Sequence, residues 1–418
     1  MKRVLVFFCA MVLFLCMASP GFATISLTKS LSMGIHFYAA HYYYHGDKEL
    51  RAKGVTVGQP TLYENAGKWE DYINSTSVFI MHWRKENYGI LCVTHIDVET
   101  EDVEDEKLGV PIVYGYWNIS PKLSLRAGKG TSLFSEIQPH AALGGGEGKA
   151  TGIAYGNYFT GYHVYARVHY KVGKHGEIKA GVVDPRATEG VYMYQVKYSP
   201  YVPHAVGFKS NGGTIDNATT IPKFELAYWH NIPLKNGRAQ IQTSAFWQEQ
   251  KFDNVAGPDN KIESYGLGLG LDGDFGPVLI MAELTYGQNW LFTKGYGWPI
   301  SPSLSGSLVH LLYGPKCNST GHLQNAEHWA GFIEARYRIG KYQPSIIFGR
   351  QTSERNVDGK KDKVALMEYG VRCPIRVHKH LEIRPEIMVF DNGTVTMAGV
   401  EKDYGKEWVA GAVFAFLF

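Results

Sequence analysis

Histidines are the residues of this sequence whose type and number most readily suggest catalysis. They include His36, His41, His82, His95, His163 and His169. A histidine acts as general base for a serine when an acidic residue orients its ring. No serine or aspartate forms a local arrangement with any of these six, so local sequence predicts no catalytic residue and no enzyme. A triad assembled across several strands stays open.

Other chemistry based on short motifs is not indicated. Outside the first 23 residues the cysteines are Cys92, Cys317 and Cys373, with no CxxC pair and no His/Cys cluster, so we expect neither a disulfide framework nor a metal site. Residues 144–150 (GGGEGKA) resemble a phosphate-binding loop only loosely, because alanine follows Lys149 and no helix is expected after it. The net charge is +3 without a basic run, which argues against nucleic acid. We expect no cofactor.

Charged side chains instead recur at every second position, opposite apolar ones. Between residues 158 and 172, one face holds Tyr162, Val164, Ala166, Val168, Tyr170 and Val172, and the other holds His163, Tyr165, Arg167, His169 and Lys171. Residues 237–251, 326–339, 363–376 and 380–391 show the same division. A period of two predicts β-strands.

The whole chain follows this rhythm, so we predict an all-β fold. Strands are expected at 31–45, 73–84, 88–99, 109–119, 122–130, 158–172, 176–184, 190–198, 201–208, 222–232, 237–251, 261–272, 277–291, 326–339, 343–354, 363–376, 380–391 and 405–418. Tight turns alternate with long connections at 46–72, 131–157, 209–221, 252–260, 292–325 and 392–404. This predicts an antiparallel up-and-down β-barrel of 18 strands, or of 16 if 190–208 is not a strand pair.

A membrane location follows from the two faces. An unpaired charge in hydrocarbon costs several kcal/mol, so the charged face must meet water while the apolar face meets lipid. A closed barrel satisfies both and leaves no unpaired sheet edge. No later segment is apolar over ~18 residues, which excludes helical spans.

The two ends of the chain fit export. Residues 1–23 combine Lys2 and Arg3 with an apolar run and a small-residue end, as in a cleaved signal peptide, which leaves residues 24–418 as the barrel. Residues 408–418 (WVAGAVFAFLF) alternate without a charge and end on an aromatic residue. A soluble β-sandwich is the alternative interpretation of that last strand.

The signal peptide, the strand rhythm and Phe418 together resemble a bacterial outer-membrane porin. The terminal strand is similar to closing strands whose final aromatics, here Phe414, Phe416 and Phe418, are read by the barrel assembly machinery. Residues 123–135 (LSLRAGKGTSLFS) resemble the stretch where the fifth strand enters the third external loop. The resemblance implies that this loop, residues 131–157, folds into the lumen and narrows it.

At such a constriction, acidic groups on the loop face basic groups on the wall, and the field between them screens solutes by charge. The loop offers Glu136, His140 and Glu147. The wall offers Arg126, Lys129 and Arg167, with Arg336, Arg350, Arg372 and Arg384 on more distant strands. Each arginine has the alternative role of pairing with a neighbouring carboxylate in the lumen.

We therefore expect a passive channel in the outer membrane for small hydrophilic solutes and ions. The resemblance implies a homotrimer in contact with outer-membrane lipid. Anion or cation preference stays open. The alternatives are an outer-membrane barrel hydrolase acting on lipid, and a surface adhesin or structural barrel with a packed interior.

Overall fold

The computed structural model describes residues 25–26, 28–46, 69–73, 78–96, 108–137, 162–184, 211–212, 216–217, 221–290, 314–391, 393–397, 399–403 and 405–417. The predicted signal peptide, residues 1–23, lies outside these ranges. The described residues contain no helix long and apolar enough to cross a membrane.

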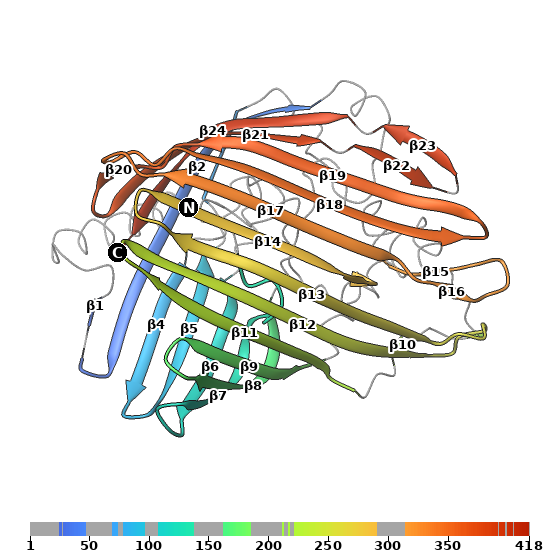
Figure 1. The fold of residues 1–418 in the computed structure, drawn as a ribbon, viewed down its shortest axis with the longest axis horizontal. Coiled ribbons are helices and arrows are strands. Elements are labelled where there is room, and N and C mark those ends of the chain that lie inside the picture. The colour runs from blue at the N-terminus through green and yellow to red at the C-terminus, as the bar shows by residue number, and fades with distance from the viewer. Residues whose placement is uncertain are drawn as a thin grey trace.

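One large antiparallel sheet dominates the structure, and its strands curl around a common axis (Figure 1). The strands are β1 (Ile25–Ser26), β2 (Leu31–Gly46), β3 (Trp69–Ile73), β4 (Val78–Lys85), β5 (Tyr88–Ile96), β6 (Leu108–Asn118), β7 (Leu123–Thr131), β8 (Tyr162–Val172), β9 (Gly176–Val183), β10 (Asp216–Asn217), β11 (Lys223–Leu234), β12 (Gly237–Asp253), β13 (Lys261–Asp274), β14 (Val278–Gln288), β17 (Glu327–Tyr337), β18 (Ser345–Val357), β19 (Lys360–Arg372), β20 (Ile375–His378), β21 (Leu381–Asp391), β22 (Thr394–Met397), β23 (Val400–Asp403) and β24 (Lys406–Leu417). A separate hairpin is formed by β15 (Lys316–Cys317) and β16 (Leu323–Gln324).

The pairings close into a ring. Within the described residues, sixteen strands follow one another as β2, β4, β5, β6, β7, β8, β9, β11, β12, β13, β14, β17, β18, β19, β21 and β24, and β24 pairs back to β2. β3 pairs with β2 beyond β4, and β22 pairs with β19 beyond β21, so these short strands lengthen positions already in the ring. The predicted antiparallel barrel is confirmed.

The sequence predicts either eighteen or sixteen strands, and the sixteen strands of the ring agree with the second number. The two further segments, 190–198 and 201–208, lie outside the described residues. β9 pairs directly with β11 from Gly176↔His230 to Val183↔Lys223, so the two strands are neighbours in the wall.

The two faces of the wall have the polarity predicted from the alternation. Large apolar side chains are exposed on the outer face, among them Val164, Leu226, Leu267, Leu284, Ile333 and Ile346. Polar and charged side chains are buried on the inner face, among them Arg167, Glu225, Gln242, Glu283, Glu334 and Arg372. This reverses the polarity of a soluble protein and suits a wall between hydrocarbon and a polar lumen.

The strand connections differ between the two rims of the barrel. Tight turns such as 173–175 between β8 and β9 and 235–236 between β11 and β12 lie at one rim, called here the short-turn rim. Gly173 and Gly276 have positive φ there, as tight hairpins require. The strand ends that lead into the long connections lie at the opposite rim, called here the long-loop rim. At this rim β18 and β19 are joined by a tight turn, Asp358-Gly359, in which both residues have positive φ.

Candidate functional site

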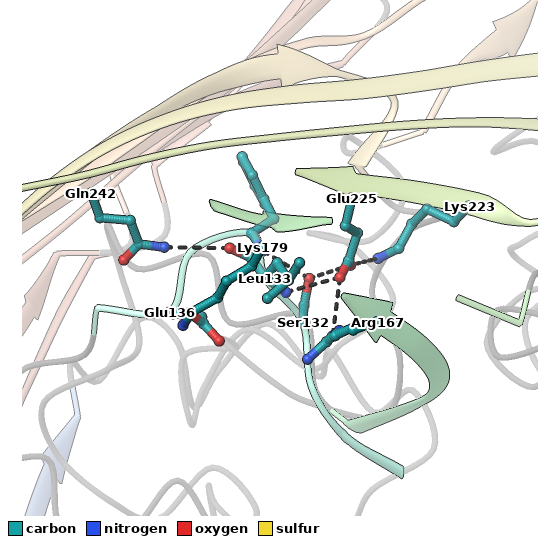
Figure 2. A network of polar contacts seen from close by, with 9 residues as sticks. Ser132, Leu133, Glu136, Arg167, Lys179, Lys223, Glu225 and Gln242 are labelled. Atoms are coloured by element: carbon teal, nitrogen blue, oxygen red, sulfur yellow. Dashed lines mark hydrogen bonds and ion pairs between the residues drawn. The ribbon is translucent and has the colours of Figure 1, made fainter. Parts of the chain in front are cut away.

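The first residues of the connection after β7 lie inside the barrel. Residues 132–137, called here the inward segment, contact the inner faces of β9, β11 and β12 (Figure 2). They also contact the inner faces of β13 and β14. Ser132, Leu133, Phe134, Ser135 and Ile137 expose 0–5% of their surface. The predicted inward turn of connection 131–157 is thereby confirmed for these residues. Residues 138–157 lie outside the described part of the chain.

Glu225 on β11 anchors the beginning of the inward segment. Its carboxylate accepts hydrogen bonds from Ser132 Oγ and, at 2.9 Å, from Leu133 N. The same carboxylate lies 3.1 Å from Arg167 Nη2 and 2.8 Å from Lys223 Nζ. A buried carboxylate is stable only when charged or hydrogen-bonded groups surround it, and Glu225 has both. The wall therefore binds the segment through one fully buried charge cluster.

Two further polar contacts hold the segment across the next strands. Gln242 Nε2 on β12 donates to Leu133 O at 3.3 Å, and Ser135 Oγ donates to the carboxylate of Glu283 on β14. Ser135 has φ 58°, a left-handed conformation that costs on the order of 1–3 kcal/mol for residues other than glycine. The bond to Glu283 helps to hold that conformation.

Glu136 is the acidic residue of the segment that meets a basic wall residue as predicted. Its carboxylate lies 3.1 Å from Lys179 Nζ on β9. Burial raises the pKa of the Glu136 carboxyl above its ordinary value, and Lys179 opposes this shift. Lys179 Nζ also lies 3.1 Å from the ring centroid of Trp229, a cation–π contact.

Phe134 fills a hollow that glycines leave open on β13. Its ring packs edge-on against Phe246, with ring centroids 4.7 Å apart, and against Trp290 at 6.3 Å. A Cβ at Gly266 would lie 2.7 Å from Phe134 Cζ, and one at Gly268 would lie 3.4 Å from Phe134 Cε2. The absence of side chains at these positions therefore makes room for the ring.

Ile137 uses the next glycine of the same row. It packs in an apolar cluster with Met281 on β14 and Phe332 on β17. A Cβ at Gly270 would collide with Ile137 Cδ1. The inner face of β13 thus receives two apolar side chains of the inward segment, one beside each end of a three-glycine row.

Arg126 on β7 lies on the inner wall beside this site. It pairs in register with Arg167 on β8 and Tyr116 on β6, and paired residues share a face. Its guanidinium lies 5.6 Å from the ring centroid of Tyr114. Among the residues that the structure describes, Arg126 makes no ion pair, whereas Arg167 is neutralised by Glu225.

The predicted basic residues Arg336, Arg372 and Arg384 lie elsewhere in the lumen. Each is close to the short-turn end of its strand. Each has a carboxylate neighbour on the inner face: Glu334 at 3.0 Å from Arg336, Glu386 at 3.6 Å from Arg372, and Glu382 beside Arg384. These three arginines therefore have the alternative role that the sequence suggested, in which each pairs with a neighbouring carboxylate in the lumen.

The assignment of Lys129 to the pore lining is wrong. Lys129 pairs in register with Val113 and Val164, which are exposed on the outer face. Because it is three residues from the inward-facing Arg126, the alternation of β7 turns its side chain away from the lumen. The placement of Arg350 on the inner wall is also wrong, because Arg350 shares the outer face of β18 with the exposed Ile346 and Phe348.

Three other predicted residues lie outside the described part of the chain, namely His140, Glu147 and Phe418. Phe414 is 38% exposed on the outer face of β24, and Phe416 occupies the same face two residues later.

Glu225, Glu283 and the glycines of β13 were not predicted. Glu225 and Glu283 belong to strands with an alternating pattern, so their inward orientation was available from the sequence, but their partners were not. Residues 264–270 (SYGLGLG) place glycine at every second position opposite Tyr265, Leu267 and Leu269. Glycine is unfavourable within strands unless another group approaches closely, and this row was the available signal.

Comparison with known proteins supports the fold through structure alone. No family model and no curated protein matches the sequence. The outer membrane channel DcaP of Acinetobacter baumannii has a TM-score of 0.62 at 11% identity, covering 94% of this chain and 100% of that chain. An anion-selective porin from Comamonas acidovorans gives 0.53 at 8%, covering 92% and 100%. The trimer form of in-vitro folded OmpT of Vibrio cholerae gives 0.50 at 10%, covering 93% and 100%. At these identities the likeness establishes a shared barrel fold.

Proposed function

We propose that this protein, which has the barrel fold of outer-membrane porins and channels, is itself a bacterial outer-membrane porin. Small hydrophilic solutes and ions would diffuse passively through its water-filled lumen, and no bond is made or broken. The observation that carries the proposal is the inward segment, because a loop anchored against the inner wall narrows a lumen that already has a polar lining. An apolar outer face supports the membrane location.

Basic side chains are concentrated on the wall beside the first residues of the inward segment. Glu225 lies between Arg167 and Lys223, and Glu136 pairs with Lys179. Arg126 adds a cation that forms no ion pair within the described ranges. A positive wall lowers the energy of an anion at a narrow point, so we propose that the channel prefers anions. His140 and Glu147 remain proposed contributors from the loop.

Further features of the proposal concern assembly. We propose that Phe414, Phe416 and Phe418 form the signal for the barrel assembly machinery, because the first two present aromatic side chains on one outer face of the closing strand. A homotrimer is proposed because one of the similar structures is described as a trimer form. The signal peptide at residues 1–23 is part of the same proposal.

The first test is electrical. The mature chain, refolded and inserted in a planar bilayer, is expected to give stable current steps of nanosiemens order in molar salt, because the proposed lumen is aqueous. Under a salt gradient, the sign of the reversal potential is expected to show anion preference. A heat-modifiable, correctly folded barrel that conducts no ions would contradict the proposal.

A second prediction separates the two inner arginines. Arg126→Gln is expected to shift the reversal potential toward cations, because it removes the unpaired charge. Arg167→Gln is expected to shift it less and to lower thermal stability more, because it removes one partner of the buried Glu225 cluster. Arg338→Gln, at the exposed Arg338–Asp274 pair on the short-turn rim, is the matched control. An equal shift of the reversal potential in all three variants would contradict the proposed role of Arg126 in anion preference.

A further inference from the structure

The outer apolar face ends in a charged row near the long-loop rim of β18 to β24. In register across four strands, Phe348, Tyr369, Val389 and Trp408 form one row. The row two residues nearer the long-loop rim is Arg350, Met367, Asp391 and Lys406. A change from aromatic and aliphatic side chains to charged ones marks the level where hydrocarbon gives way to lipid headgroups.

Arg350 is the unusual member of this charged row. It shares the outer face of β18 with Ile346 and Phe348, which are 63% and 43% exposed. Its guanidinium lies 5.4 Å from the ring centroid of Trp329, and it makes no ion pair with any residue in the described ranges. Asp391 is occupied by Lys406 at 3.0 Å. A guanidinium beside hydrocarbon is stabilised by an anion, and Arg350 forms no ion pair with the carboxylates of the described residues.

A second cation lies close by and is only partly neutralised. Lys363 is 3.9 Å from Glu354, but Glu354 already binds Lys361 at 2.8 Å. Lys361, Lys363 and Glu354 together carry one more positive charge than negative charge. The hollow beside them has a volume of about 400 Å³ and is lined by both Arg350 and Lys363, together with Thr394, Thr396 and two acidic residues, Glu401 and Asp391, of which Asp391 is paired with Lys406.

We propose that this hollow binds the phosphate group of a phosphorylated glycolipid in the outer leaflet of the membrane. Arg350 offers a planar pair of N–H donors suited to a phosphate, Lys363 adds a point charge, and the threonine hydroxyls can donate further hydrogen bonds. The acyl chains of the same lipid would lie against Phe348 and the apolar row. The inference rests on the proposed membrane location and is independent of the solute pathway.

Titration of the full mature chain in detergent micelles with bisphosphorylated lipid A, followed by native mass spectrometry, tests the proposal. The double variant Arg350→Gln/Lys363→Gln is expected to bind about tenfold more weakly, since it loses charge-assisted hydrogen bonds. Glu401→Gln is expected to bind more tightly, because a repelling charge is removed. Lys261→Gln, at an exposed rim lysine paired with Glu249, is the matched control and should bind as the native protein does.

Three other results of this titration would overturn the proposal. Equal binding of lipid A and of the same lipid without phosphates would show that acyl chains alone carry the affinity. Equally tight binding of inorganic phosphate would exclude a lipid-specific site, and a double variant that binds normally would exclude these residues. Planar-bilayer conductance of the double variant is expected to match that of the native protein, so failure of the lipid proposal is distinguishable from failure of the channel proposal.

Discussion

Replacing Glu225 with alanine is expected to detach the inward segment and to increase single-channel conductance. The substitution removes the acceptor of Ser132 Oγ and Leu133 N and leaves Arg167 and Lys223 without their shared carboxylate. Removing one partner of a buried ion pair costs about 3–5 kcal/mol. The polar anchors that remain are the Gln242–Leu133 and Ser135–Glu283 hydrogen bonds and the Glu136–Lys179 pair, which hold the later residues of the segment, so its first residues are expected to detach.

Conductance in a planar bilayer and the rate of proteolysis after residue 131 are the measurements for this variant. Both are expected to rise. Glu249→Ala, at the exposed Lys261–Glu249 pair, makes the same change outside the lumen and should alter neither. Glu225→Gln keeps the shape of the side chain, so its conductance and its rate of proteolysis should lie between those of the native protein and of Glu225→Ala. Native-like conductance and proteolysis of Glu225→Ala would contradict an anchoring role.

Gly266→Val is expected to displace Phe134 from its hollow without breaking any charge cluster. The new Cβ would lie 2.7 Å from Phe134 Cζ and would also collide with the ring of Phe246. Overpacking of this kind costs about 1–3 kcal/mol when neighbours must move. Because Phe134 belongs to a loop and Phe246 belongs to the wall, the loop is the part that should move.

The expected readouts are larger and noisier current steps with an unshifted reversal potential, because no charge changes. Leu267→Val is the matched control: the adjacent residue of β13 is 57% exposed on the outer face, and its replacement should leave the current unchanged. If Gly266→Val conducted as the native channel does, the glycine row would have no part in seating the segment.

The strands and the orientation of their faces could be predicted because one physical rule governs both. Each strand must turn one face to lipid and one to the lumen, so alternation recurs along the whole chain and fixes strand ends to within a few residues. β8 and β12 illustrate this, since the predicted strands 158–172 and 237–251 correspond to Tyr162–Val172 and Gly237–Asp253. The number of strands was harder, because the alternation within 190–208 is compatible both with a strand pair and with a connection.

Parity within one strand would have corrected the assignment of Lys129. Arg126 and Lys129 are three residues apart, and an odd separation places two side chains on opposite faces. Their nearness in sequence and their equal charge made them look like one group. The same parity rule identifies Arg167 as a lumen residue, because it is flanked by the apolar Ala166 and Val168.

The contacts that hold the inward segment could not be predicted, since they join residues distant in sequence across the lumen. Ser132 is 93 residues from Glu225, and Ser135 is 148 residues from Glu283. Alternation says only that these carboxylates face inward. Which loop residue contacts these carboxylates depends on how the strands are tilted and how the barrel closes, and the alternation within one strand does not determine either.

The pairing of β2 with β24 also has a consequence for biogenesis. These strands lie near opposite ends of the described chain, yet they form eleven register pairs, from His36↔Leu417 to Gly46↔Glu407. Contacts between such distant segments form late and slowly, because the loop entropy must be met first. Until they form, both strands present unpaired backbone edges that invite pairing with other chains. A chaperone or assembly factor that shields these two edges in transit would therefore matter more for yield than for the stability of the finished barrel.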